Sequence, residues 1–174
     1  MRHYLITLTL LAATGLTIQS GHKPQKPQIR MARAISRGNF KRVQAILSQD
    51  PSMINRPYSG LSPLLRAALV TQTTTDHDHP RLKILALLAA QDPHPGQPGP
   101  QLLDTALHYA SLNPAALDTL LSNLPDHCLI PNYLKRKDAR GRTPYDWAKQ
   151  AQQAESIWLM EQWERNAYLL KQTT

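Results

Sequence analysis

The chain has 174 residues and 41% of them are hydrophobic, which is enough for one folded unit with a core of ordinary density. Only 6% are aromatic, with a single Phe, so a sheet built from aromatic and β-branched residues is disfavoured and an all-α protein is expected. The formal charge of +8 indicates acidic partners, anionic lipid or nucleic acid, and the lone Cys128 excludes an internal disulfide and a CxxC-type zinc site.

The first twenty residues have the pattern of a secretory signal peptide. A basic Arg2 precedes the charge-free apolar run 5–18, which is shorter than the roughly 20 residues of a spanning helix. We therefore predict a signal peptide over 1–20 and a periplasmic or secreted protein. An uncleaved membrane anchor and a buried first helix are the alternatives.

Residues 21–28 contain two prolines, two lysines and no apolar side chain. Such a segment has nothing to bury, which predicts a flexible leader. The folded domain is expected over 29–171.

The rest of the chain contains an internal repeat. Segments 60–68, 103–111 and 141–149 each place a hydroxyl residue before Pro or Ala, then a large apolar residue and an alanine. A fourth copy, 34–47, lacks its start. The repeated alanines stand at positions 34, 67, 110 and 148.

These segments resemble ankyrin repeats, whose hallmark is a Thr-Pro-Leu-His-x-Ala block that opens a unit of about 33 residues. The resemblance implies an all-α solenoid of about four helix-turn-helix repeats. The longer spacings then require polar insertions at 71–80 and 92–100, and a looser stretch at 125–137.

The repeated block also has a physical logic of its own. Ser62-Pro63 and Thr143-Pro144 are typical of a helix N-cap followed by proline in the first turn. Small alanines permit neighbouring helices to approach closely. His108 matches the histidine that makes structural hydrogen bonds in the family.

Apolar residues recur at helical spacing between 155 and 170. This predicts a long C-terminal helix that caps the stack and covers its last apolar face.

Catalytic and metal-binding motifs are weak. Asp76-His77-Asp78-His79 could supply metal ligands, but alternating ligands in a polar insertion favour a solvated loop. The sequence shows no nucleophile–base pattern, Gly-rich phosphate loop or paired-carboxylate motif. We therefore expect no catalytic residue, no cofactor and no metal.

The densest run of charge is 135–142, which contains five cations and one carboxylate. By the resemblance it lies on the hairpin finger that leads into the last repeat. It favours an acidic protein surface or phosphate groups as ligand. A solvated basic turn is the alternative, and nucleic acid is disfavoured because no aromatics are interleaved.

Ankyrin proteins generally bind through the concave surface made by finger tips and inner helices. By position, this surface would include Asn113 beside the expected partner-binding residues. Those residues are Arg37, Tyr58, Leu61, Leu69, Val70, Leu102, Leu112, Arg140 and Arg142. The leucines and the valine would form an apolar centre with an arginine rim; core packing is their alternative explanation.

The sequence thus predicts an exported protein-binding module of the adaptor or inhibitor type, monomeric, with a protein partner that carries acidic groups. No nucleic acid is expected as partner, and no membrane after signal cleavage. A secreted effector that acts on a host protein, and an enzyme or metal-binding protein with its site in the insertions, are the alternatives.

Overall fold

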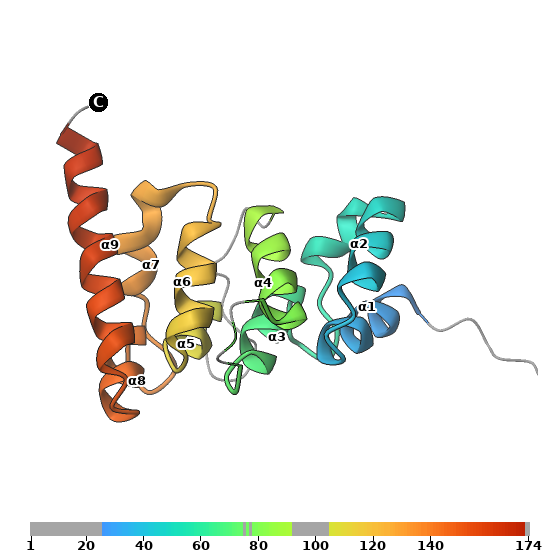
Figure 1. Cartoon of the computed structure of the whole chain (residues 1–174), viewed down its shortest axis with the longest axis horizontal. Coiled ribbons are helices and arrows are strands. Elements are labelled where there is room, and N and C mark those ends of the chain that lie inside the picture. The colour runs from blue at the N-terminus through green and yellow to red at the C-terminus, as the bar shows by residue number, and fades with distance from the viewer. Residues whose placement is uncertain (1–25, 75, 77, 92–104, 173–174) are drawn as a thin grey trace, which may run out of the picture.

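The computed structural model describes residues 26–74, 76, 78–91 and 105–172 (Figure 1). The helices of these residues are α1 (Pro27–Ser36), α2 (Phe40–Gln49), η1 (Pro51–Asn55), α3 (Pro63–Val70), α4 (Pro80–Gln91), α5 (Ala106–Ala110), α6 (Pro114–Ser122), η2 (His127–Leu129), α7 (Ile130–Leu134), α8 (Pro144–Gln150) and α9 (Ala154–Gln172). The 1–20 signal prediction and most of the predicted leader lie outside this set. α1 begins at Pro27, two residues before the expected domain start.

The described helices form two layers. In the inner layer α1 contacts α3, α3 contacts α5 and α5 contacts α8, while α2, α4, α6 and α9 follow one another in the outer layer. Figure 1 shows these helix pairs in a row, with α1 at one end and α9 at the other. The prediction of an all-α stack of helix pairs is confirmed.

Side-chain caps fix where the inner helices begin. The Ser62 hydroxyl accepts a hydrogen bond from the Leu65 amide at 3.1 Å. Thr143 forms a reciprocal capping box with Asp146, whose carboxylate accepts from the Thr143 amide at 2.8 Å. Proline follows both caps, where its missing N–H costs no helical bond. The capping predicted from the sequence is therefore confirmed.

The repeated alanines lie where the inner helices meet. Ala67, Ala110 and Ala148 have no exposed surface. A methyl side chain at these points lets the inner helices pack closely, and a larger one would need space that a well-packed interior does not have.

The long C-terminal helix α9 covers the last face of the stack, as predicted. Met160 and Ala167 are buried, and α9 contacts α6, α7 and α8. Its outward face still carries large apolar side chains, with Trp158 57% and Tyr168 65% exposed.

The expectation of a loose stretch over 125–137 was wrong. The segment forms η2 and α7, and both contact α9. Ile130 and Leu134 are buried, four residues apart on one face of α7. This apolar pair gives the short helix a face to bury against α9.

Part of the insertion 71–80 is also more ordered than a solvated loop. Thr71 and Thr74 are buried, and the Asn113 side-chain amide donates to the Thr71 carbonyl at 2.7 Å as well as to the Thr74 carbonyl. Asn113 itself is only 4% exposed, so its predicted place on an open binding surface was wrong. The side-chain oxygen Oδ1 of Asn113 caps α6 by accepting a hydrogen bond from the Ala115 amide at 3.0 Å.

None of the helices that the structure describes is long and apolar enough to cross a bilayer.

Candidate functional site

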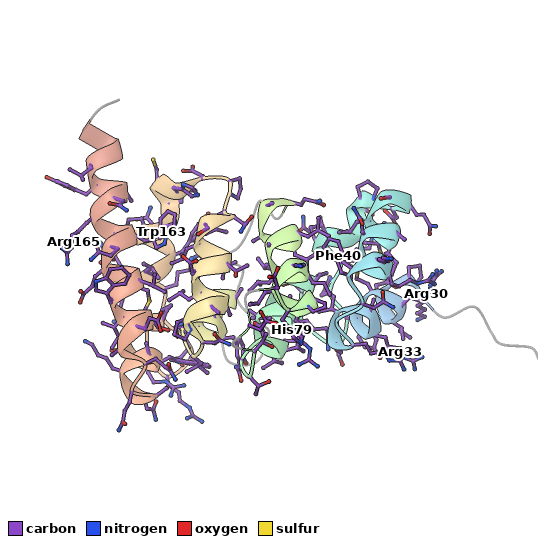
Figure 2. All side chains as sticks on the ribbon, in the orientation of Figure 1. Arg30, Arg33, Phe40, His79, Trp163 and Arg165 are labelled. Carbon is purple, nitrogen blue, oxygen red and sulfur yellow. The ribbon has the colours of Figure 1, made fainter. Side chains whose placement is uncertain are left out.

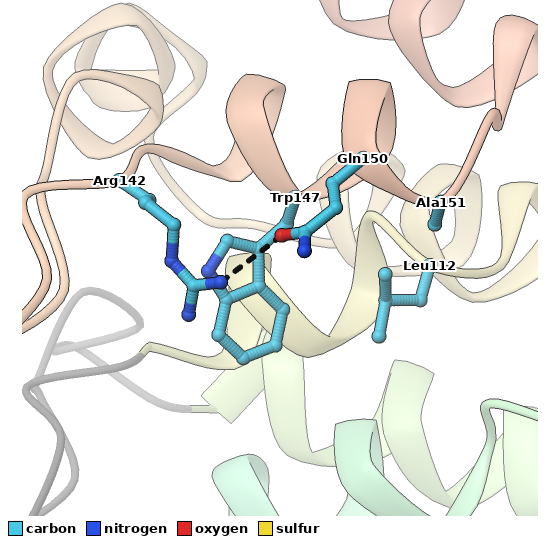
Figure 3. A pocket seen from close by; sticks show the side chains of 5 residues that line it. All are labelled: Leu112, Arg142, Trp147, Gln150 and Ala151. Carbon is cyan, nitrogen blue, oxygen red and sulfur yellow. Dashed lines mark hydrogen bonds between the residues drawn. The ribbon is translucent and has the colours of Figure 1, made fainter.

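A pocket of about 240 Å³ opens beside the last inner helix (Figure 3). We call it the Trp147 pocket. It is lined by Leu112, Arg142, Trp147, Gln150 and Ala151. These residues come from α8 and the position after it, from the turn that ends α5, and from the loop that precedes α8. The pocket therefore lies on the side of the inner helices and their preceding loops.

The loop before α8, residues 138–142, is organised around one carboxylate; we call it the last finger. Oδ1 of Asp138 accepts from the backbone amides of Arg140 and Arg142, both at 2.9 Å. Oδ2 accepts from the Arg142 guanidinium, at 2.9 Å from Nε and 2.7 Å from Nη2, and from the Trp147 indole at 2.9 Å. Asp138 is 6% exposed, so this finger is held by a buried, fully bonded charge.

The electrostatics of Asp138 follow from this geometry. Burial opposes ionisation of the carboxyl, but the hydrogen bonds from the Arg142 amide, the Trp147 indole, the Arg142 guanidinium and the Arg140 amide outweigh it. Together they hold the pKa of Asp138 well below its ordinary value. Asp138 is consequently an anion at neutral pH.

Trp147 forms the wall of the pocket and is fixed from several sides. Its ring makes T-shaped contacts with the rings of His108 and Tyr109, each at 5.4 Å between centroids. The Arg142 guanidinium lies 5.1 Å from the indole centroid and donates to the Gln150 side chain at 3.1 Å. A partly exposed Trp beside Arg, both already held in place, is the kind of surface on which binding energy concentrates in protein interfaces.

A second pocket, of about 260 Å³, lies at the other end of the stack. We call it the arginine pocket. It is lined by Arg30, Arg33, Ala34, Arg37, Asn39 and Arg42. Figure 2 places Arg30 and Arg33 at the end formed by the first helix pair. The arginine pocket thus belongs to the first repeat, and the Trp147 pocket lies between the last two.

Helical spacing brings the arginines together. Arg30, Arg33 and Arg37 are separated by three and four residues at one side of α1 and its C-cap. Gly38, at φ +69°, then turns the chain so that Asn39 caps α2 and Arg42 follows in its first turn. From the sequence, only Arg37 was predicted to bind a partner, and Arg30, Arg33 and Arg42 were missed. The spacing of three and four residues between the arginines of α1 and its C-cap indicates a shared helix face.

Comparison with known proteins adds one relationship. No family model and no curated protein matches the chain by sequence. Among solved structures it resembles the ankyrin repeat domain of Bcl-3, described as a unique member of the IkappaB protein family, with a TM-score of 0.62 and 19% identity. The match covers 75% of this chain and 54% of the other, so the chain spans about half the length of that structure.

The chain has the ankyrin-repeat fold. The Trp147 pocket then belongs to the surface of fingers and inner helices. Two predicted partner-binding residues, Leu112 and Arg142, line it. Arg140 is exposed on the same finger, with only its backbone amide tied to Asp138.

The other predicted residues that the structure describes belong to the first two ankyrin repeats. Tyr58 is 40% exposed and pairs through its backbone with Leu61, which packs against the core. Leu69 and Val70, at the end of α3, are half-buried, and Val70 also contacts the core. Arg37 lines the arginine pocket, and Leu102 lies outside the described residues. The apolar centre with its arginine rim therefore stays a prediction.

Asp138 and Trp147 were not among the residues predicted for the binding surface. Trp147 sits in the repeated block at a position that the pattern leaves open, so the pattern gave it no special weight. In the sequence, Asp138 is one acid among five cations. Its role as hydrogen-bond acceptor for the last finger becomes evident only in the folded loop.

Within the described residues, no three His, Cys, Asp or Glu side chains are placed to hold a metal ion. Asp78 instead pairs with Lys83 at 3.2 Å, and the Asp76 carboxylate accepts from the Asp78 amide. His77 lies outside the described residues.

Proposed function

We propose that this chain is a protein-binding module that holds its partner against the surface of fingers and inner helices, with the Trp147 pocket as anchor. The observation that carries the proposal is that Trp147 and Arg142 are fixed around buried Asp138 and still line an open pocket. A surface fixed before binding loses little conformational freedom when a partner arrives.

The chemistry of the pocket favours a mixed contact. Leu112 and the Trp147 ring supply apolar surface, while Gln150 and Arg142 supply polar groups at its edge. The exposed Arg140 and the run Lys135, Arg136 and Lys137 add positive charge nearby in the chain. An apolar side chain flanked by carboxylates is the partner element that would suit this surface.

We further propose that the protein acts after export, as a periplasmic or secreted adaptor or inhibitor. Support comes from the basic Arg2 and the apolar run 5–18. Cell fractionation of the full chain with a C-terminal tag tests this part. Recovery of the whole chain in the cytosolic fraction, at its uncleaved mass, would refute it.

The binding proposal is tested by filling the pocket. Ala151 is exposed at its edge, so Ala151→Arg places a long charged side chain in the cavity without disturbing the core. Ala45→Arg makes the same change on the outward face of α2 and serves as the matched control. Tagged full chains are expressed in the native cell, cross-linked and purified.

The expected result is one protein that co-purifies with the wild type and with Ala45→Arg and is depleted about tenfold or more with Ala151→Arg, as when a central anchor is blocked. Equal recovery with both variants would exclude the Trp147 pocket as the anchor. Equal circular dichroism spectra and unfolding temperatures show that the comparison concerns binding and not folding.

A further inference from the structure

Three side chains of the arginine pocket have no counter-ion among the residues that the structure describes. Arg30, Arg37 and Arg42 form no ion pair with a carboxylate there. In the sequence, no Asp or Glu precedes Asp50, so the preceding chain has no acidic side chain to offer. Asp50 is itself engaged, accepting from the Ser52 amide at 3.1 Å and pairing with Arg56 at 3.6 Å.

Clustered arginines destabilise α1, which together with its C-cap carries three of the four. Like charges three and four residues apart on a helix repel one another. Three guanidinium groups on α1 and its cap, with a fourth from α2 across the turn, concentrate this repulsion around one cavity. A bound anion would offset it, because each guanidinium offers a planar fork of N–H donors.

Size and charge limit the class of anion. The cavity of about 260 Å³ is below the range of roughly 300–1,000 Å³ that is usual for drug-sized ligands, so a compact group fits best. A single carboxylate brings one negative charge to Arg30, Arg37 and Arg42, whereas linked phosphoryl groups bring several charges and several acceptor oxygens. Asn39 adds polarity at the N-terminal end of α2, which also favours an anion.

We propose that the arginine pocket binds a small soluble ligand that carries linked phosphoryl groups, of the diphosphate class. The site is separate from the Trp147 pocket and independent of the protein partner. It is formed by the first helix pair, and its ligand bridges α1 to α2 through Arg30, Arg37 and Arg42.

The test is isothermal titration calorimetry, in which the full chain is titrated with inorganic diphosphate in a chloride buffer. The variant Arg30→Gln/Arg37→Gln removes two of the guanidinium groups, and glutamine keeps a good helix propensity. Lys135→Gln/Lys137→Gln removes the same charge from the exposed basic run near the last finger and is the matched control. A nucleoside diphosphate titrated in parallel distinguishes an organic phosphate from the free ion.

We expect saturable one-to-one binding by the wild type and by the lysine variant, weakened about tenfold or more in the arginine variant. Tighter binding of the nucleoside diphosphate would assign an organic phosphate as ligand of the same pocket. Equal weakening in both variants would show attraction by net charge alone and would overturn the proposal. So would the absence of saturable binding, or binding of a glutamate-rich peptide or anionic vesicles at these arginines without binding of diphosphate.

Folding is checked separately from binding. Because the substitutions relieve repulsion between exposed or half-buried side chains, the unfolding temperature of the arginine variant without ligand should not fall below that of the wild type. In the wild type, diphosphate should raise the unfolding temperature, and in the arginine variant it should do so much less. The same shift in both proteins would place the ligand elsewhere.

Discussion

The ring of His108 links two repeats, because its Nε2 lies 3.0 Å from the carbonyl oxygen of Arg142, 34 positions later in the chain. Nδ1 of the same ring lies 3.0 Å from the Thr105 amide and accepts from it. Nε2 must then carry the proton of the neutral ring and donate to Arg142. One buried side chain therefore closes the first turn of α5 and also holds the last finger beside Trp147.

Replacing His108 with Ala should lower the free energy of unfolding by about 2–4 kcal/mol, because it opens a cavity and leaves the Thr105 and Arg142 backbone groups without their partner. Urea denaturation followed by tryptophan fluorescence measures this loss. His108→Gln is the companion variant, since glutamine at the third helical position can complete a capping box. It should lose less than His108→Ala, and an equal loss would mean that the cap contributes nothing.

Asp138 should make the stability of the protein depend on acid pH. Its folded-state pKa lies below the ordinary value of about 3.9, so the ionised carboxylate stabilises the fold at neutral pH. This contribution is present above the ordinary pKa and is lost as the pH falls from about 4 toward the lowered value. Asp138→Asn should cost about 2–4 kcal/mol at pH 7 by leaving the partly buried Arg142 guanidinium without its counter-charge, and less at pH 3.

Urea denaturation at pH 7 and pH 3 measures this difference. Asp118→Asn removes the same charge from α6, outside the finger, and is the control. If Asp138→Asn costs the same free energy at both pH values, the ionised carboxylate is not what holds the finger.

The Asn113 side chain has two roles, as the N-cap of α6 and as a donor to two carbonyls of the preceding loop, and two variants separate them. Asn113→Asp keeps an oxygen that caps α6 but replaces the amide donor with a second oxygen that faces the Thr71 and Thr74 carbonyls. Asn113→Ala removes both cap and donor, with an expected cost of about 2–4 kcal/mol. Asn113→Asp should be at least as costly, because repulsion with buried carbonyls outweighs the retained cap.

Hydrogen exchange resolves which part of the molecule responds. Both Asn113 variants should release amide protection at the Thr74 N–H, which donates to the Thr71 carbonyl. The control Asn123→Ala, which removes a donor to the Thr119 carbonyl alone, should leave that amide protected. Unchanged protection at Thr74 in Asn113→Ala would show that the loop holds itself.

Particular residues show which structural roles could be predicted from the sequence. The caps Ser62 and Thr143 and the small Ala148 were predictable, because each depends on a short local pattern that the repeats share. His108 has no histidine counterpart in the other repeated segments, and its structural role was predicted from the resemblance to the ankyrin block. Asn113 was misplaced, because its role depends on carbonyls 42 and 39 positions earlier, to which no local pattern points.

The binding surface was predictable only in part for the same reason. Leu112 and Arg142 meet in one pocket, as the resemblance implied, because both positions are set by the repeat frame. Their neighbour Trp147 gains its importance from Asp138 and His108, which approach it from two other elements. The arginine pocket forms through a turn at Gly38, so its members look unrelated until α2 is placed beside α1.

Substitution of Gly38 and of Gly141 by alanine distinguishes the cost of backbone strain from the cost of a steric contact. Both residues have positive φ, +69° and +76°, where any other residue is strained. A Cβ at Gly38 would also lie 3.2 Å from Cγ of Arg81, whereas a Cβ at Gly141 would meet nothing within 4 Å. Gly141→Ala should therefore cost about 1 kcal/mol, from the backbone alone, and Gly38→Ala more.

Arg81 explains the extra cost at Gly38. Its guanidinium donates to the Val70 carbonyl at 3.2 Å and to the Ser36 carbonyl at 3.4 Å, so moving it weakens a link between the first two repeats. Thermal unfolding of both glycine variants gives the comparison. Equal losses would mean that Arg81 shifts at no cost.

The alanines of the inner layer should tolerate no larger side chain. Ala110 has no exposed surface and lies on α5, which packs between α3 and α8. Ala110→Leu adds volume where the helices approach closely and should lower the free energy of unfolding by about 1–3 kcal/mol. Ala45→Leu makes the same change on the exposed side of α2, where it should stay within about 0.5 kcal/mol of the wild type. Because α8 carries Trp147, the displacement in Ala110→Leu should also shift the tryptophan fluorescence of the native state, and a shift of equal size in Ala45→Leu would contradict a stack whose spacing is set by its alanines.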